Sequence, residues 1–204
     1  HIILLPEVPF EKGKFIAQVK QTVKSNGYCV IVASEGTKTK AGKFLADSGL
    51  TDAFGHKQLG GVAPVISSMI SKIGLKNHWA VADYLQRSAR HIASKTDLDQ
   101  AYAVGEHAVK LAVAGKTAVM PIIKRISDSP YKWKITTAPL KNIANVEKSM
   151  PRKFISKNGF EITSAGRKYL SPLIQGEAPT NFKFGIPEVA SLKKTFVKKK
   201  LKEF

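Results

Sequence analysis

Two short apolar runs that flank an amphipathic stretch constrain the fold of this chain more than any other feature. His1–Leu5 and Tyr28–Ala33 are rich in Ile, Leu and Val, as is typical of strands covered on both faces. Between them, apolar residues recur at helical spacing after Pro9 and Glu11, and Gly27 ends the repeat. A strand, a helix and a strand with short joints form the βαβ unit of a parallel sheet. We therefore expect an α/β fold.

The rest of the chain shows weaker patterns of the same kinds. Apolar spacing, together with glycine and proline, predicts further elements. The expected helices are 43–47, 61–73, 97–114, 140–148 and 162–174, and the expected strands are 78–84, 117–123 and 131–137. In the longest helix, six apolar side chains should face inward: Leu98, Ala101, Val104, Ala108, Leu111 and Ala112. From Gly176 onward, prolines and lysines predict an irregular arm.

Charge is the other prominent property of the chain. The chain has 33 lysines and arginines but only 15 aspartates and glutamates, which gives a formal net charge of +18 at pH 7. Such a balance is typical of proteins that bind nucleic acid, an anionic membrane or phosphorylated small molecules. Only five of the basic residues are arginines, although base edges and bidentate phosphate contacts favour arginine over lysine. We therefore expect most of the charged side chains to lie on the surface, in contact with solvent. A lysine-rich nucleic-acid-binding protein is the alternative from a different functional class.

Apolar runs and cysteine content bear on where the chain works. No apolar run approaches the roughly 20 residues that a transmembrane helix needs, and no signal peptide opens the chain. The single cysteine, Cys29, excludes an internal disulfide framework and favours a reducing, cytoplasmic setting. Because the chain enters an apolar strand at His1 without a methionine, we expect it to be a piece of a longer protein.

Two loops that follow predicted strands carry side chains suited to chemistry. Glu7 comes directly after the first strand, and open α/β sheets bind ligands outside the carboxyl ends of their strands. A carboxylate there can accept hydrogen bonds from sugar hydroxyls, or it is simply a helix-start charge favoured by the dipole. The second loop, Asp83–His91, gathers a tyrosine, two arginines and a histidine. Those donors suit a phosphate group; the alternative is an ordinary charged loop.

Other candidate constellations are weaker. Ser34-Glu35-Gly36 follows the second strand and could line the same crevice, but a plain loop carboxylate is the favoured interpretation. His56, His78, His91 and His107 lack metal-ligand spacing with a third ligand nearby, so we expect no zinc site. Neither a nucleophile elbow nor a Walker-type glycine loop occurs in the sequence.

Several of these motifs together resemble the phosphofructokinase family. In that family's order and spacing the chain has Leu5-Pro6-Glu7-Val8-Pro9-Phe10, Ser34-Glu35-Gly36 and Tyr84-Leu85-Gln86-Arg87. Further segments resemble its pyrophosphate-dependent branch: 52–56, 58–64, 86–94 and Met150-Pro151-Arg152. ATP-dependent members typically carry a histidine at the position of Tyr84 and two glycines after the arginine. The resemblance covers essentially the whole chain.

The resemblance implies reversible transfer of a phosphoryl group, with Mg²⁺, from pyrophosphate to the 1-hydroxyl of fructose 6-phosphate. The product would be fructose 1,6-bisphosphate, as in glycolysis and gluconeogenesis. By this resemblance Glu7 binds the sugar, whereas Tyr84 and Arg87 hold its 6-phosphate, with Leu85 and Gln86 as the intervening turn.

One position departs from the family pattern. A further family arginine, which reaches the 6-phosphate from a neighbouring subunit, would fall near His78, where this chain has no arginine. Arg90 is a candidate substitute.

The resemblance also implies that part of the site lies outside these residues. The catalytic base, the phosphoryl-donor loop with its metal-linked aspartate and a Met-Gly-Arg substrate motif would all precede His1. We therefore expect no catalytic residue and no metal ligand here, and an N-terminal half of the same protein as a partner. Because phosphoryl transfer depends on positioning and charge neutralisation, these residues alone should bind fructose 6-phosphate weakly and not catalyse.

In fold, the resemblance implies a three-layer α/β phosphofructokinase-like architecture with parallel-rich sheets, of which this chain is only the C-terminal part of two lobes. Residues 1–87 would belong to the sugar-phosphate-binding lobe, 88–150 to a return into the phosphoryl-donor lobe, and 151–204 to a C-terminal extension wrapping the body. The resemblance further implies a cytoplasmic homo-oligomer, either a dimer or a tetramer, that binds neither nucleic acid nor membrane. An ATP-dependent phosphofructokinase and a non-catalytic regulatory paralogue remain as alternatives within the family.

Overall fold

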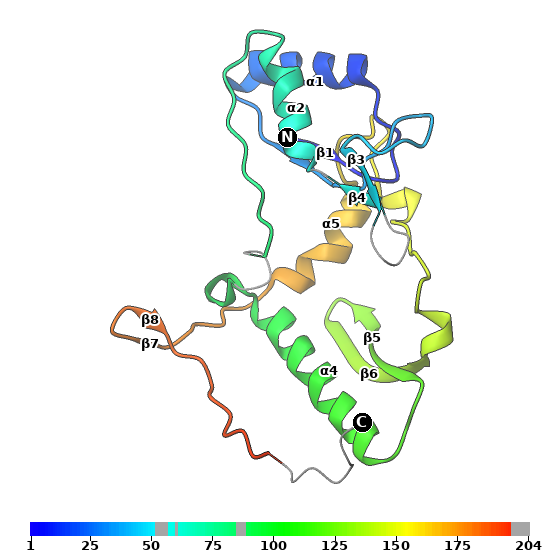
Figure 1. Ribbon diagram of the computed structural model, residues 1–204, viewed down its shortest axis with the longest axis vertical. Helices are drawn as coiled ribbons and strands as arrows, with labels where there is room; N and C mark the ends of the chain where they lie inside the picture. The colour runs from blue at the N-terminus through cyan, green and yellow to red at the C-terminus, as the bar shows by residue number, and fades with distance from the viewer. Residues whose placement is uncertain (52–56, 60, 85–88, 197–204) are drawn as a thin grey trace, which may run out of the picture.

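A computed structural model describes residues 1–51, 57–59, 61–84 and 89–196. Figure 1 shows helices α1 (Lys12–Asn26) and α2 (Val62–Ser71) at one end of the molecule, near the N-terminus. Helix α4 (Lys95–Val113) and the hairpin of β5 (Val119–Asp128) and β6 (Tyr131–Pro139) lie at the other end. Helix α5 (Ser164–Leu170) lies between the two groups.

The predicted βαβ unit is confirmed. Strand β1 (Ile2–Leu4) pairs in parallel with β2 (Ile31–Ala33), and α1 forms the connection between them. Gly27 ends α1 in the left-handed conformation, with φ of +80°, and its N–H donates to the carbonyl of Val23. Glycine adopts this φ without the steric penalty of a Cβ, which is why the helix ends there.

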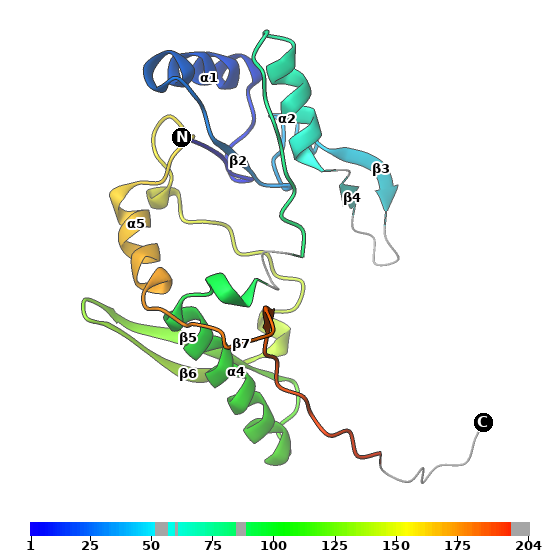
Figure 2. The ribbon, with the colours of Figure 1, turned by 90° about the vertical axis from the view of Figure 1, so that its left-hand side faces the viewer.

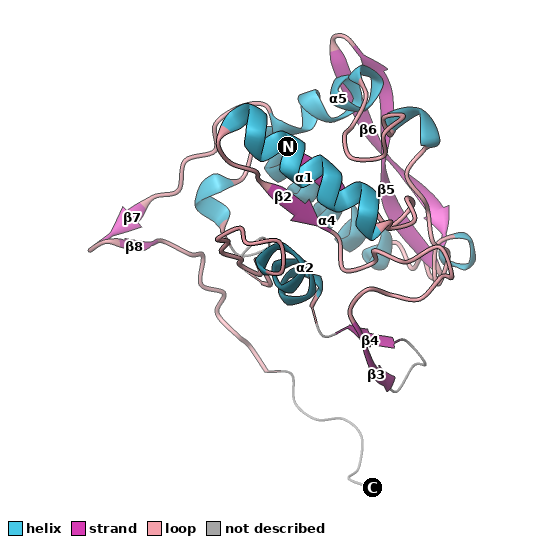
Figure 3. Cartoon of the chain, turned by 90° about the horizontal axis from the view of Figure 1, so that it is seen from above, coloured by secondary structure: helices cyan, strands magenta, loops and turns pink. Residues whose placement is uncertain are grey.

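The main core lies where α1 and α2 pack on the β1–β2 ladder (Figure 3). Ile2 and Phe15 are completely buried there, and Val19 is 1% exposed. The apolar residues of α2 at positions 62, 66 and 70 face the same cluster. Burial of these aliphatic and aromatic groups, at about 25 cal/mol per Å² of apolar surface, holds the unit together.

The long helix and the hairpin confirm three predicted elements but correct one expectation. Figure 2 shows α4 lying along β5 and β6, where the Gln100 side chain donates to the Tyr131 hydroxyl at 2.6 Å. The inward face predicted for α4 is only partly right. Leu98, Val104 and Leu111 are half-buried, whereas the alanines at 101, 108 and 112 are exposed. The reason is that, within the described ranges, the hairpin and the 3₁₀ turn Ser171–Ile174 cover only part of the surface of this helix.

Two predicted elements are wrong. Residues 78–84 are exposed and do not form a strand, because no described strand lies beside them to complete a ladder; the segment ends in a turn at Asp83 and Tyr84. Residues 43–47 are not helical. Instead, Thr39 donates to the Lys43 carbonyl and Leu45 to the Thr37 carbonyl, which closes a loop before β3 (Asp47–Thr51) and its antiparallel partner β4 (Lys57–Leu59).

The C-terminal region contains short elements. The predicted helix 162–174 is confirmed as α5 followed by a 3₁₀ turn, Ser171–Ile174. The predicted helix 140–148 is reduced to one 3₁₀ turn, Leu140–Asn142. Strands β7 (Phe182–Lys183) and β8 (Ile186–Pro187) form a minimal hairpin in an arm whose residues 181–196 are exposed. None of the helices in the described ranges is long and apolar enough to cross a membrane.

Truncation of the central core residue should be costly. Phe15→Ala removes a fully buried ring, and we expect it to lower the free energy of unfolding by about 3–5 kcal/mol. Lys20→Ala, at an exposed position of the same helix, should change it by less than about 0.5 kcal/mol. Urea denaturation of the protein that contains this chain measures both values. Equal effects of the two substitutions would contradict the assignment of the core.

Candidate functional site

The turn after β1 holds Glu7, and the two oxygens of its carboxylate differ. Oε1 accepts a hydrogen bond from the backbone N–H of Met150 at 2.7 Å. Oε2 is buried, and no residue in the described part of the chain donates to it. A buried polar atom is normally hydrogen-bonded, since leaving it unpaired costs free energy. Glu7 is therefore prepared to accept a hydrogen bond from a group that these residues do not supply.

The carboxyl ends of β1 and β2 meet at this turn. The Ser34 N–H donates to the Leu4 carbonyl at 3.0 Å, and the Thr37 hydroxyl donates to the Ser34 carbonyl at 2.6 Å. A Cβ on Gly36 would lie 3.1 Å from the Cβ of Pro6, so the two turns are in close contact. The segment Ser34–Gly36 thus lies beside the Glu7 turn, although the Glu35 side chain itself is exposed.

A loop from far along the chain completes the surroundings of Glu7. Arg152 folds this loop on itself, because its Nη1 donates to the carbonyls of Ile155 at 2.8 Å and Ser156 at 3.2 Å. Gly159 then approaches the Glu7 turn so closely that a Cβ would lie 2.9 Å from Val8 Cγ1. The family-like motif that contains Met150 therefore lies against the family-like motif that contains Glu7. No local sequence pattern predicts this contact.

A cavity of about 180 Å³ lies next to this loop, between it and the start of α1. Apolar residues such as Leu4, Phe10 and Phe160 line this cavity. Four cationic residues line it as well: Lys14, Lys40, Arg152 and Lys157. Glu11, in the same wall, forms ion pairs with Lys14 at 2.7 Å and Lys40 at 3.0 Å. Hydrogen bonds from these two lysines lower the pKa of Glu11. The surroundings of this cavity are thus positively charged overall.

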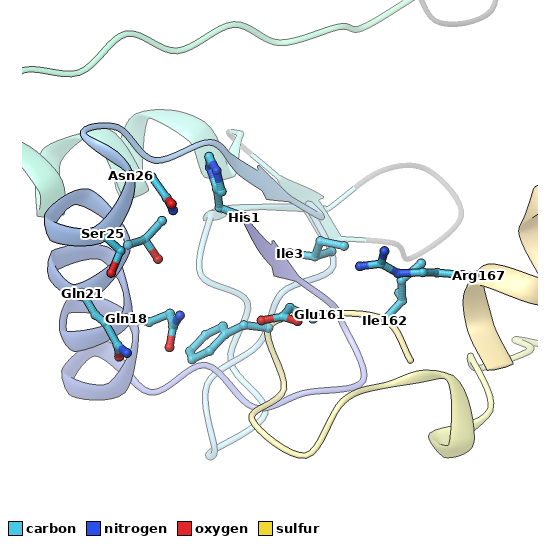
Figure 4. Close-up of a pocket in the computed structure, with 11 residues that line it drawn as sticks. His1, Ile3, Gln18, Gln21, Ser25, Asn26, Glu161, Ile162 and Arg167 are labelled. Atoms are coloured by element: carbon cyan, nitrogen blue, oxygen red, sulfur yellow. The ribbon is translucent and has the colours of Figure 1, made fainter. Parts of the chain in front are cut away.

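A second cavity, of about 500 Å³, opens at the other side of β1 (Figure 4). Amide and hydroxyl side chains of α1 line it together with His1, Glu161 and Arg167. Among these, His1 Nδ1 accepts a hydrogen bond from the Val30 N–H at 2.9 Å. This second cavity is lined by none of the site residues predicted from the sequence. Cavity size alone therefore does not identify the candidate site.

The predicted phosphate-binding residues lie elsewhere along the chain. His78 and Tyr84 are in the exposed segment after α2, and the Tyr84 side chain is 67% exposed. The other predicted residues of this motif, Leu85, Gln86 and Arg87, lie outside the described residues.

Arg90 is in a 3₁₀ turn, Arg90–Ile92, and its Nη1 donates to the Ala178 carbonyl at 2.7 Å. Glu7 is bonded to Met150, whereas Arg90 is bonded to Ala178. The two predicted site residues, Glu7 and Arg90, are thus held by different segments and not by each other.

The described residues do not fit a metal site. No group of three histidine, cysteine, aspartate or glutamate side chains that could hold a metal ion occurs in the described ranges. Glu7 is a single carboxylate with one oxygen already engaged, whereas Mg²⁺ in proteins is bound through near-octahedral sets of oxygen ligands.

Comparison with known proteins identifies close relatives, although no protein-family model matches the chain. The chain is 59% identical over 205 residues to the pyrophosphate–fructose 6-phosphate 1-phosphotransferase of Halomonas elongata, which covers 100% of this chain and 49% of that protein. It is 54% identical over 201 residues to the protein of the same name from Methylococcus capsulatus, with 98% and 48% covered.

A solved structure agrees with these relatives. The pyrophosphate-dependent phosphofructokinase of Nitrosospira multiformis superimposes with a TM-score of 0.83 at 52% identity, over 100% of this chain and 48% of that one. The chain thus spans about half the length of the relatives it matches, and the expected α/β fold is confirmed. By its sequence and its fold, this chain belongs to the phosphofructokinase family, alongside the pyrophosphate-dependent members.

Proposed function

We propose that the protein containing this chain transfers a phosphoryl group reversibly from pyrophosphate to the 1-hydroxyl of fructose 6-phosphate. In this proposal the chain supplies part of the sugar site. The observation that carries it is the Glu7 carboxylate, with one oxygen held by Met150 and the other buried with no donor among the described residues. Relatives with 54–59% identity and that activity in their names support it. They support it over the ATP-dependent and nucleic-acid-binding alternatives.

Glu7 has a simple chemical role in this proposal. Its Oε2 accepts a hydrogen bond from a hydroxyl of the sugar, which pairs the buried oxygen. The Met150 N–H holds Oε1, so the carboxylate does not need to reorient when the sugar arrives. A bond to a charged acceptor is stronger than one between neutral groups. Glu7 therefore contributes to both the affinity and the orientation of the acceptor sugar.

The 6-phosphate of the sugar would be held by the segment that starts at Tyr84. The phenol hydroxyl of Tyr84 donates one hydrogen bond, and the planar guanidinium of Arg87 donates two in parallel. Leu85 and Gln86 would form the turn that presents these donors.

Two further residues are candidates for the same phosphate. Arg90 carries five N–H donors, of which one is engaged with Ala178, and it would add positive charge. His78 stands in the exposed segment before the motif and would occupy the place of the family's intersubunit arginine.

We assign the other components of the reaction to the remaining part of the longer protein. The catalytic base, the pyrophosphate loop and the ligands of Mg²⁺ would come from there, and the metal would neutralise phosphate charge in the transfer. Within the chain we divide residues 1–87, 88–150 and 151–204 between the sugar-phosphate lobe, the donor lobe and a C-terminal extension. A cytoplasmic dimer or tetramer is part of the same proposal.

The phosphoryl donor can be tested directly on the full-length protein. With fructose 6-phosphate and Mg²⁺, we expect turnover with pyrophosphate and none above background with ATP. Residues 1–204 alone should give no turnover with either donor. Activity with ATP only would establish the ATP-dependent alternative, and a full-length protein inactive with both donors would establish a non-catalytic paralogue.

The role of Glu7 predicts a selective loss of sugar affinity. Glu7→Gln keeps an oxygen for the Met150 N–H but removes the charge from the second position. Since a hydrogen bond to a charged group contributes about 1.5–3 kcal/mol, the KM for fructose 6-phosphate should rise about 10- to 160-fold. The KM for pyrophosphate should stay unchanged.

Glu188→Gln is the matched control, because Glu188 is an exposed carboxylate directly after β8 in the C-terminal arm. We expect wild-type steady-state kinetics from it. If Glu7→Gln and Glu188→Gln behave alike, the buried carboxylate does not bind the sugar.

A further inference from the structure

The cavity of about 180 Å³ beside the Glu7 turn is a feature that the proposed reaction leaves unused. None of the predicted sugar-site residues is among the described residues that line it. Its lining comes from three segments that are distant in sequence: residues 4–14, residues 37–40 and residues 152–160. Since a water molecule occupies about 30 Å³ in the liquid, the cavity has room for a small molecule and not for a large cofactor.

Charge is the main property of this cavity. Its four cations come from three segments: Lys14 from α1, Lys40 from the loop after β2, and Arg152 and Lys157 from the C-terminal loop, residues 150–160. Glu11 is the one acidic residue in the described lining, so the net formal charge around the cavity is +3. Neither Arg152 nor Lys157 forms an ion pair with a described residue. An anion that enters the cavity would therefore meet positive charge from several sides.

Glu11 holds two of these lysines in place and leaves them able to bind a ligand. Its Oε1 accepts a hydrogen bond from Lys14 at 2.7 Å, and its Oε2 lies 3.0 Å from the Lys40 ammonium. An ammonium group has three N–H donors, of which each lysine directs only one toward Glu11. Both lysine side chains are 69% exposed, so a ligand can reach them. Because Glu11 already orders these cations, less freedom is lost when an anion binds.

The start of α1 adds a second kind of attraction for an anion. Residues 9–11 and Lys14, which lead into the helix and form its first turn, line the cavity. The first N–H groups of a helix lack intrahelical partners, and in α1 the Glu11 side chain does not cap them. The first turn also contains no acidic residue. The positive end of the helix dipole therefore adds to the charge of the four cations.

The C-terminal loop forms the opposite wall of the cavity, and its own hydrogen bonds hold it in shape. Asn158 Oδ1 accepts from the Ser156 hydroxyl at 2.5 Å and from the Phe160 N–H at 3.0 Å. Arg152 Nη1 donates to two carbonyls of the same loop, at 2.8 Å and 3.2 Å. These bonds fix the backbone that carries Lys157. The wall is thus formed before any ligand arrives.

From these observations we infer that the cavity binds a small organic phosphate, and that it does so without the described sugar-site residues. A phosphate ester carries about two negative charges and three acceptor oxygens, which suits cations that converge from three segments and the N–H groups of a helix start. A carboxylate offers a single charge on two oxygens in one plane and matches this arrangement less well. The apolar residues Leu4, Phe10 and Phe160 would contact the carbon atoms of the ester.

The test measures binding of glycerol 2-phosphate to the full-length protein by isothermal titration calorimetry in low-salt buffer. Fructose 6-phosphate is present at a saturating concentration to fill the sugar site, and pyrophosphate and Mg²⁺ are left out so that no turnover occurs. We expect saturable binding of one glycerol 2-phosphate molecule per chain. Succinate, a dicarboxylate, should bind more weakly than this phosphate ester.

Two double variants with the same loss of charge locate the binding. Lys40→Gln with Lys157→Gln removes two lysines from the lining of the cavity. Lys43→Gln with Lys153→Gln removes two lysines of the same two loops that do not line it. Each lysine of the lining should contribute about fivefold to affinity, the upper range for an exposed ion pair, so the first double variant should weaken binding about 25-fold. The second should change it less than about twofold, because solvent and salt screen more distant charges.

The outcomes of this test do not depend on the proposed function. All four lysines are exposed, so we expect both double variants to fold like the wild type. Equal effects of the two double variants would overturn the inference, since the probe would then respond only to overall charge. Absence of probe binding, or succinate binding as tight as that of glycerol 2-phosphate, would also overturn it. If the wild-type protein does not turn over fructose 6-phosphate, the proposed function fails while probe binding still reports on the cavity.

Discussion

Strand β1 is buried, and its backbone groups must therefore find partners within the protein. On one side it pairs with β2, whose register is set by the α1 connection. On the other side the Ile3 N–H donates to the Phe160 carbonyl at 2.8 Å. This bond brings back a loop from the distant C-terminal region. The arrangement of the N-terminal half of the described chain follows from pairing the backbone groups of this one strand on both of its edges.

The candidate site depends on this bond between β1 and the C-terminal loop. The loop that pairs with Ile3 also carries Met150, whose N–H holds Glu7 at the carboxyl end of β1. Val8 and Gly159 are in close contact beside it, which leaves little freedom for either turn. The buried Glu7 oxygen, to which no described residue donates, is thus held on a rigid support. Rigid placement of a charged acceptor favours one orientation of a bound sugar.

Local sequence patterns predicted much of the fold. They failed where contacts with other segments of the chain determine the structure. The βαβ unit, α2, α4 and the β5–β6 hairpin were predictable because each has its own periodicity and glycine or proline boundaries. Residues 78–84 have strand-like composition, but no described strand pairs with them, so they stay exposed and without regular structure. The inward face of α4 was overestimated for a similar reason: a helix buries only what its neighbours cover, and the described neighbours, the hairpin and the 3₁₀ turn Ser171–Ile174, leave the alanines at 101, 108 and 112 exposed.

The amino-acid sequence by itself determined the α/β class, the family-like motifs and the choice of Glu7 as a site residue, because these depend on periodicity and on short runs of residue types. The tertiary structure decided what those residues contact. Glu7 and Met150 are 143 positions apart, and Arg90 and Ala178 are 88 apart. No periodicity extends over such separations. Only the packing of β1 and of residues 173–178 brings these groups within hydrogen-bonding distance.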